Sequence, residues 1–365
     1  MSRVTANSSS IMAGSSSQAI QNQAWLQTLM HKKPEQIVSE WSQLFRELEK
    51  RPVETSLIHS VRSARSTSAK STQPTFAKKI WIIDDPVTRK RFYITRGPKT
   101  TEMTEFYSTF TKLGITVVLN FARLHEGPLG PGGAADFMDA LYFPCTPGEI
   151  AHFVIPVGDT TAEVIVTNAR INDVVAVSDL DVDVNVDIKK AVVGDCHTIE
   201  PRQNTQITHV QHFNWPPDDQ PWCTDSVLQT LNSIHSLQSG SEAPEKIMSV
   251  MLLCADGYTR SGAFAALNHC IVRVETANDT NPFDLTTVVK QVVEMLRAQC
   301  PNAMRNERIF LWLNYAIVEH AVKRWVEAAL EKKESKRACD WLAKLRKAVY
   351  SHGEKKSVLN ISLMA

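Results

Sequence analysis

The sequence lacks the cysteine pairs that would build a zinc site or a disulfide framework. Its seven cysteines are an odd number, stand far apart and include no CxxC pair. Scattered cysteines are typical of a reduced intracellular protein and argue against a small secreted domain held by disulfides. The histidines are not spaced with the cysteines as metal ligands either. We therefore expect a cytoplasmic protein with no bound metal and no cofactor.

Long hydrophobic runs and an excess of charge of one sign are also missing. No apolar stretch approaches the roughly 20 residues that span a bilayer. The first ten residues, MSRVTANSSS, contain neither a signal-peptide core nor a glycine at position 2 for myristoylation. Lysine plus arginine (40) nearly equal aspartate plus glutamate (39), so the net charge of +1 gives no general attraction to nucleic acid. The sequence predicts no transmembrane segment and no nucleic-acid partner, and it leaves the oligomeric state open.

Composition divides the chain into three parts. Residues 1–30 begin with a stretch rich in Ser, Asn, Gln and Ala, and we expect this segment to be disordered. Hydrophobic residues make up 43% of the 365, enough for one large domain, which we place at residues 31–323. Residues 324–365 are basic and are expected to form a helix and a tail. With cations beside Trp341 and Leu345, this helix is either a solvated terminal element or a peripheral contact for acidic lipid or an acidic partner.

Apolar periodicity and turn residues predict strands and helices that alternate along the central part. The acidic stretch 179–187 does not match a calcium loop, and we expect a turn and an edge strand there. Helices are expected at residues 34–50, 101–113, 225–237, 261–274, 285–298 and 306–323. Strands are expected at residues 80–83, 91–94, 115–120 and 247–253, near residue 205, and as antiparallel strands within 153–193.

Residues 254–262, CADGYTRSG, join an apolar strand to a predicted helix. In such a loop the backbone N–H groups converge and the helix dipole adds positive charge, which makes an anion site. There Cys254 is expected to have a lowered pKa, and Arg260 is expected to grip two phosphate oxygens. Together they predict attack on phosphorus through a cysteinyl-phosphate intermediate. The alternative is a buried structural cysteine beside an ordinary helix start.

The remaining residues of the loop fit the same interpretation. Gly257 and Gly262 would let the backbone turn and approach closely. Ser261 is expected to hydrogen-bond the sulfur and help it leave. The residues predicted to bind phosphate are Ala255, Asp256, Gly257, Tyr258, Thr259 and Arg260.

This loop fits the pattern CxxGxxR[ST]G and resembles the signature of the protein tyrosine phosphatases. The resemblance covers about residues 75 to 320 and implies a divergent member of the non-receptor type. It implies an α/β fold with a twisted mixed sheet flanked by helices on both faces, and a phosphotyrosine-containing protein or peptide as partner. Further segments follow in the family's order: YITRGP (93–98) resembles "YIATQGP", ITVVLNFARLHEG (115–127) resembles "VIVMLTxxxE", YFP (142–144) resembles "YWP", HVQHFNWPPDDQP (209–221) resembles "HYxxWPDxGxP", and RAQCP (297–301) resembles "RxQRPG".

The segment that resembles the family's acid loop departs from the family pattern. The resemblance implies a general acid two residues after the tryptophan. When Trp215 and Pro221 are both matched, Pro217 occupies that place and Asp218 lies one residue later. A shift of one residue moves a side chain by about 3 Å or more. We expect Asp218 to be a displaced catalytic acid or, alternatively, a solvated loop carboxylate.

Other departures from the family weaken the predicted chemistry further. Leu253 stands where the family has a histidine that supports the thiolate. Asp256 stands where active members have a small apolar residue and where known inactive members have aspartate. A carboxylate there is expected to repel a phosphate dianion and raise the thiol pKa, unless it faces solvent. The tyrosine that sets substrate depth is missing, because residues 1–80 contain no tyrosine, and residues 303–309 replace the late glutamine motif.

The sequence thus predicts a signalling protein of this fold that keeps the Cys-x5-Arg cradle but is a weak or inactive phosphatase. It would act by binding a phosphorylated partner. The alternative is an active protein tyrosine phosphatase, in which Cys254 is the nucleophile, Arg260 binds phosphate, Asp218 is the acid and Ser261 assists the sulfur. A lipid or nucleotide phosphatase ranks below both, because the loop lacks the extra basic residues usual in that class.

Overall fold

A computed structural model gives the structure of the chain. It describes residues 24–51, 80–85, 90–99, 102–122, 150–157, 160–172, 176–185, 203–212, 215–216, 219–239, 247–277, 283–328 and 332–352. The chain divides into two compact units. The helical unit comprises Met1–Glu54, Ala263–Ala298 and Ala303–Ala365, and the sheet unit comprises Thr55–Gly262 and Gln299–Asn302.

The described residues of the sheet unit form one eight-stranded sheet in the order β1-β2-β8-β3-β7-β6-β5-β4. The four middle neighbours, β2, β8, β3 and β7, pair in parallel, whereas β1 and the β4–β6 side pair antiparallel. The sheet is therefore mixed. Its strands are β1 (Trp81–Asp85), β2 (Lys90–Thr95), β3 (Val117–Asn120), β4 (Ile150–Val157), β5 (Thr160–Asn172), β6 (Ala176–Asn185), β7 (Gln203–Gln211) and β8 (Met248–Leu253).

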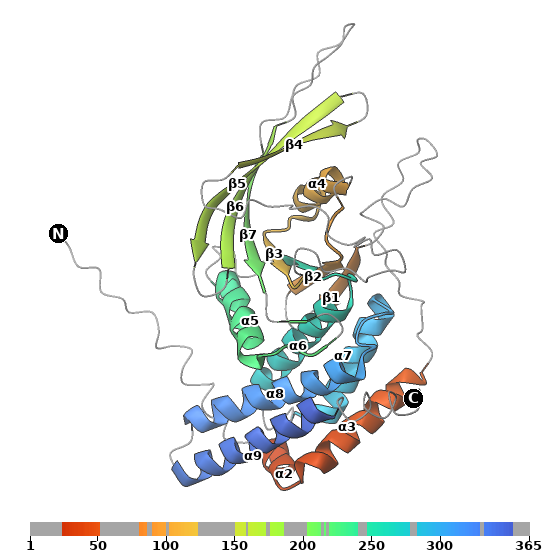
Figure 1. Cartoon of the computed structure of the whole chain (residues 1–365), viewed down its shortest axis with the longest axis vertical. Coiled ribbons are helices and arrows are strands. Elements are labelled where there is room, and N and C mark those ends of the chain that lie inside the picture. The colour runs from red at the N-terminus through yellow and green to blue at the C-terminus, as the bar shows by residue number, and fades with distance from the viewer. Residues whose placement is uncertain are drawn as a thin grey trace, which may run out of the picture. The chain divides into compact units, whose positions relative to one another are not determined.

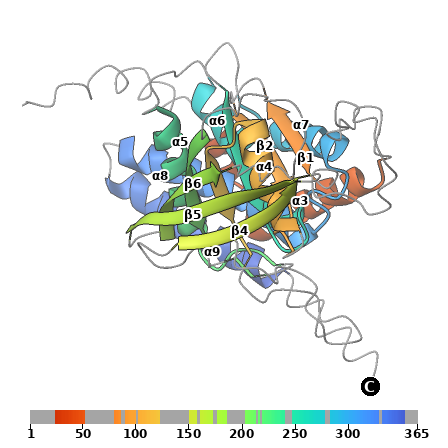
Figure 2. The same cartoon turned by 90° about the horizontal axis from the view of Figure 1, so that it is seen from above.

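The antiparallel side of the sheet confirms the strands expected within residues 153–193 and corrects one of them. Seen from above, β4, β5 and β6 lie side by side (Figure 2). β6 pairs with β5 on one side and β7 on the other, so the expectation of a turn and edge strand at 179–187 is wrong for its described part. The acidic alternation was misleading, because an antiparallel strand can pair on both sides and still have one face in water.

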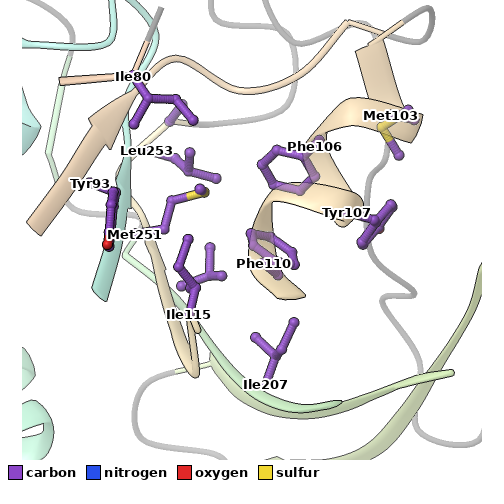
Figure 3. Packing of buried hydrophobic residues seen from close by; sticks show 12 residues of the cluster. Ile80, Tyr93, Met103, Phe106, Tyr107, Phe110, Ile115, Ile207, Met251 and Leu253 are labelled. Atoms are coloured by element: carbon purple, nitrogen blue, oxygen red, sulfur yellow. The ribbon is translucent and has the colours of Figure 1, made fainter. Parts of the chain in front are cut away.

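Helix α4 (Met103–Leu113) covers the parallel strands with an aromatic face. Its rings pack edge to face, with Phe106 and Phe110 centroids 4.7 Å apart. Figure 3 shows Phe106 and Phe110 facing Met251 and Leu253 of β8 and Ile115, which precedes β3. The buried cluster contains Ile80, Tyr93, Met103, Phe106, Tyr107, Phe110, Ile115, Val118, Ala122, Ile207, Met251 and Leu253. This core fixes the strand ends from which the candidate site projects.

The helical unit contains α3 (Pro34–Glu49), α7 (Leu285–Gln299), α8 (Glu307–Ala328) and α9 (Lys332–Ser351). Helices α3, α8 and α9 lie against one another (Figure 1). The middle of α8 is buried all round, including Trp312, Tyr315 and Val318. The boundary between the two units falls inside α6 (Thr259–Thr276).

The domain boundaries predicted from composition remain predictions. Residues 1–23 lie outside the described residues, but α2 (Ala24–Met30) is helical within the segment expected to be disordered. Two apolar side chains explain this helix: Leu26 is buried, and the Trp25 ring lies 4.9 Å from the Phe283 ring. Helix α8 continues without a break past residue 323. Among the described helices, none is long and apolar enough to cross a bilayer.

Candidate active site

The cysteine loop begins where the central strand β8 ends. The backbone N–H of Cys254 donates to the Thr95 carbonyl at the end of β2 (3.3 Å). On the other side, the N–H of Phe121 donates to the Leu253 carbonyl (2.8 Å). The loop therefore opens at the carboxyl edge of three parallel strands, the edge at which open α/β sheets bind ligands. Helix α6 then starts at Thr259, as the predicted strand–loop–helix requires.

Gly257 turns the backbone, as expected for a glycine in this loop. Its φ is +78°, in the left-handed region that only glycine adopts without cost. A Cβ atom at this position would lie 2.6 Å from the Arg96 backbone nitrogen. The loop thus packs directly on the chain that leaves β2, and a side chain at 257 would push the two apart.

The Asp256 carboxylate occupies the centre of the loop. Its Oδ1 accepts hydrogen bonds from the Cys254 thiol (3.1 Å) and from the backbone N–H groups of Tyr258 and Thr259 (3.0 Å each). Its Oδ2 accepts one from the Thr259 hydroxyl. The alternative that Asp256 faces solvent is wrong: it caps the N-terminus of α6 and takes the thiol and amides that a bound phosphate would take.

The Cys254 thiol is buried and holds its proton. Burial, reinforced by the Asp256 charge, raises its pKa to about 12. The Arg260 charge and the hydroxyl and backbone N–H of Ser261 act the other way and are outweighed. The expectation of a lowered cysteine pKa is therefore wrong. A loop dipole lowers the pKa of a thiol, but here the thiol is wholly buried beside a carboxylate that already takes the loop amides.

The Arg260 side chain is buried, 2% exposed, and reaches two other segments of the sheet unit. Its Nη1 donates to the carbonyl oxygens of Phe121 (2.6 Å) and Trp215 (2.9 Å). Its charge still lowers the pKa of Cys254, so it acts on the thiol. Sequence reasoning missed both carbonyl partners, because backbone acceptors 139 and 45 positions away leave no residue-type signal.

The segment that resembles the acid loop is anchored by its tryptophan. Trp215 is fully buried, and its ring N–H donates to the Asp219 carbonyl (2.9 Å). The Asp219 carboxylate accepts the N–H of Gln220 (2.7 Å). Asp218, the predicted acid, and Pro217 lie outside the described residues. The direction of the Asp218 carboxylate thus stays a prediction.

The buried ring of His212 lies beside this anchor. Its ring packs near Trp215 and Phe121, and its Nε2 is 3.1 Å from the Ser226 hydroxyl. Burial, reinforced by the Arg260 charge, lowers the pKa of His212 to about 4. At neutral pH the ring is uncharged, and it packs behind the Phe121 and Trp215 segments that Arg260 holds together.

The remaining predicted site residues lie in the bend after β8 or in the first turn of α6. Ala255 and Tyr258 are half-buried, Ser261 is buried, and Ala255 also packs on the core cluster behind α4. Within the described part of the chain, no group of three His, Cys, Asp or Glu side chains is placed to hold a metal ion.

Comparison with known proteins agrees with this geometry. Residues 69–319 match the family model described as protein-tyrosine phosphatase. Tyrosine-protein phosphatase non-receptor type 9 of Rattus norvegicus is 27% identical over 147 residues, which cover 38% of this chain and 23% of that protein. Its Homo sapiens counterpart is 26% identical over 149 residues, covering 38% and 24%. The match thus spans about a quarter of the length of these relatives.

The fold has solved counterparts as well. The crystal structure of the Trypanosoma cruzi protein tyrosine phosphatase TcPTP1 superposes with a TM-score of 0.51. It covers 73% of this chain and 79% of its own at 16% identity, which is evidence for the fold alone. The family match and the fold together confirm the α/β class and the resemblance drawn from the motifs: this chain belongs to the protein-tyrosine phosphatase family.

Proposed function

We propose that this member of the family turns over phosphotyrosine weakly or not at all and acts by binding a phosphorylated partner. The observation that carries the low turnover is the Asp256 carboxylate, bonded to the Cys254 thiol and to two amides of the loop. It holds the nucleophile as a thiol. With its pKa raised to about 12, the cysteine is almost entirely in the unreactive thiol form at neutral pH.

The first chemical step would form an S–P bond as the ester O–P bond breaks, and it needs both a thiolate and a proton for the leaving phenolate. The first requirement is opposed by burial and by Asp256. The second would fall to the displaced Asp218. Proton donation by a placed acid is worth about 10²- to 10⁴-fold in rate, so the two deficits together predict very slow turnover.

Binding of a phosphate group asks less of the same residues. The phosphate must displace the Asp256 carboxylate, after which the N–H groups of Tyr258 and Thr259 become its donors. The turn at Gly257 holds those amides in place, and the Arg260 charge lies close enough to act on the Cys254 sulfur. A phosphotyrosine-containing protein is the partner that the family relationship favours.

Turnover is tested by phosphate release from para-nitrophenyl phosphate at neutral pH. We expect the wild-type rate to equal that of Cys254→Ser, because neither supplies a thiolate. Asp256→Ala removes the carboxylate and should raise the rate above that of Cys254→Ser, and Asp256→Ala/Cys254→Ser should lose the gain. A wild-type rate well above that of Cys254→Ser would overturn the proposal in favour of an active enzyme.

Binding is tested separately with a fluorescent phosphotyrosine peptide and its unphosphorylated twin. We expect the phosphorylated peptide alone to bind, Asp256→Ala to bind it more tightly, and Arg260→Met to bind it less tightly. Arg260→Met also removes the clamp on two carbonyls, so a thermal melt must accompany it. Equal binding of both peptides by the wild type and by Asp256→Ala would reject phosphate recognition by this loop.

The active-phosphatase alternative rests on one specific observation. The Arg260 charge and the Ser261 hydroxyl and amide all lower the pKa of Cys254, as a working site would need. In that reading Cys254 is the nucleophile, Arg260 binds the phosphate and Asp218 donates the proton. The comparison of wild type with Cys254→Ser decides between the two.

A further inference from the structure

Helix α9 carries a line of exposed positive charge along one face. Its members are the basic stripe, defined as Lys333, Lys336, Arg337, Lys344 and Lys347, all of them exposed. At about 100° per residue these five positions fall within an arc of roughly 100° on the helix. One carboxylate, Asp340, lies in the same arc, so the stripe keeps a net positive charge.

The opposite face of α9 is already buried in the helical unit. Its apolar residues pack where α9 meets α3 and α8, and the Trp341 ring N–H donates to the Lys32 carbonyl (3.3 Å). This face is therefore not available to insert into a bilayer, as an interfacial amphipathic helix would do. The buried residues are Ala338, Trp341, Leu342, Leu345 and Val349.

The stripe cations differ from other surface cations of the same unit. Lys32 pairs with Glu40, and Arg324 pairs with Glu275. Among the residues that the structure describes, no carboxylate lies within ion-pair distance of any of the five stripe cations. The positive charge of α9 is thus left for a partner outside the described chain.

We propose that the basic stripe is a docking surface for the anionic headgroups of a lipid bilayer. From Lys333 to Lys347 the stripe runs roughly 21 Å along the helix, a length that suits a plane of charge and not a single small anion. No exposed aromatic side chain interrupts it to stack nucleic-acid bases. The contact is electrostatic and reversible, weakens with salt, and stands apart from the proposed phosphate binding.

A neighbouring pocket does not compete for this role. It has a volume of about 280 Å³ and lies between α2, α8 and α9. Arg337 lines it, but so do the Glu334 carboxylate and the tryptophans Trp325 and Trp341. A carboxylate at its wall disfavours an anion there, so the headgroup contact belongs to the exposed stripe.

The test is co-sedimentation of the full chain with vesicles of phosphatidylcholine mixed with phosphatidylserine, or of phosphatidylcholine alone. We expect binding to the mixed vesicles only, lost as salt is raised. Removing two stripe charges in K344Q/K347Q should weaken it by about 30-fold. The matched control R46Q/K50Q removes two exposed charges from the end of α3 and should leave it unchanged.

Failure of this proposal is distinguishable from failure of the proposed function. Cys254→Ser should bind vesicles like the wild type, because the cysteine loop takes no part. The lipid assignment is overturned by absence of binding to mixed vesicles, or by equal weakening in both double variants. Binding of single-stranded RNA through the same two lysines, without vesicle binding, would also overturn it.

Discussion

The side chain of Asp256 decides the state of the candidate active site. A carboxylate in this loop was expected to oppose both phosphate and thiolate, and the pKa of Cys254 moves in that direction. The sequence does not indicate the direction in which the Asp256 side chain points. Asp256 turns inward because two amides, a hydroxyl and a thiol give it four donors in the loop, and only the folded backbone brings them together.

One residue-level expectation failed, and one residue has contacts that its sequence context does not indicate. The thiol pKa was expected to fall because sequence indicates the helix dipole but not the depth at which the sulfur lies. Phosphate binding by Arg260 stays a prediction, and one of its nitrogens also donates to the carbonyls of Phe121 and Trp215. Every residue type has a backbone carbonyl, so a sequence motif cannot indicate which carbonyls accept hydrogen bonds from Arg260.

The buried His212 gives the folded state a defined sensitivity to acid. The unfolded chain takes up a proton on this ring near pH 6.5, whereas the folded chain takes it up only near pH 4. Its contribution is therefore present above about pH 6.5 and is lost as the pH falls through 4. We expect His212→Gln to lose less stability than the wild type between neutral pH and pH 5, measured by urea midpoints at both values. A parallel loss in the two proteins would contradict this assignment.

At the scale of elements, the strand–loop–helix of β8 and α6 was predictable and the placement of β6 was not. Apolar periodicity marks both β8 and α6, and the pattern of Cys254, Gly257 and Arg260 marks the turn between them. Strand order depends on pairing between distant segments, which the local sequence does not show. The acidic residues of β6 alone therefore led to the wrong prediction of an edge strand. The family resemblance carried the fold further than periodicity did.

The cysteine loop depends on a glycine for two separable reasons, its backbone angle and its neighbour. Gly257 and Gly114 both have positive φ, but only at Gly257 would a Cβ meet backbone, at 2.6 Å from Arg96 N. We expect Gly114→Ala to cost about 1–2 kcal/mol of unfolding free energy from the angle alone. Gly257→Ala should cost clearly more and also weaken phosphopeptide binding. Equal costs, measured by urea denaturation, would show that the loop yields without strain.

At the scale of the whole molecule, the chain consists of a sheet unit that holds the candidate site and a helical unit that ends in α9. The domain boundary that composition predicts at residue 323 separates α9 from the large domain placed at residues 31–323. Within the helical unit, however, α9 packs on α3 and α8 through a buried apolar face. We therefore treat α9 as part of that unit's core and its outer face as the surface available to partners.

This packing predicts a large cost for a small change in α9. Leu345 is 0% exposed, and Leu345→Ala should lower the unfolding free energy by about 2–5 kcal/mol. The exposed Lys344→Ala on the same helix is the control and should change it by less than about 0.5 kcal/mol. Tryptophan fluorescence in urea is the readout, because five of the eight tryptophans belong to the helical unit: Trp25, Trp41, Trp312, Trp325 and Trp341. Similar midpoints for both variants would mean that α9 is a loosely attached tail.

The inward carboxylate of Asp256 has a consequence for any search for ligands of this protein. Being covalently tethered, it competes with free oxyanions as if present at a local concentration of about millimolar or higher. A phosphate mimic that binds tightly to similar loops without an inward carboxylate must first displace the Asp256 carboxylate in this protein. Apparent affinities of such compounds should therefore be uniformly poor, and compounds that use the carboxylate as an acceptor should fare better.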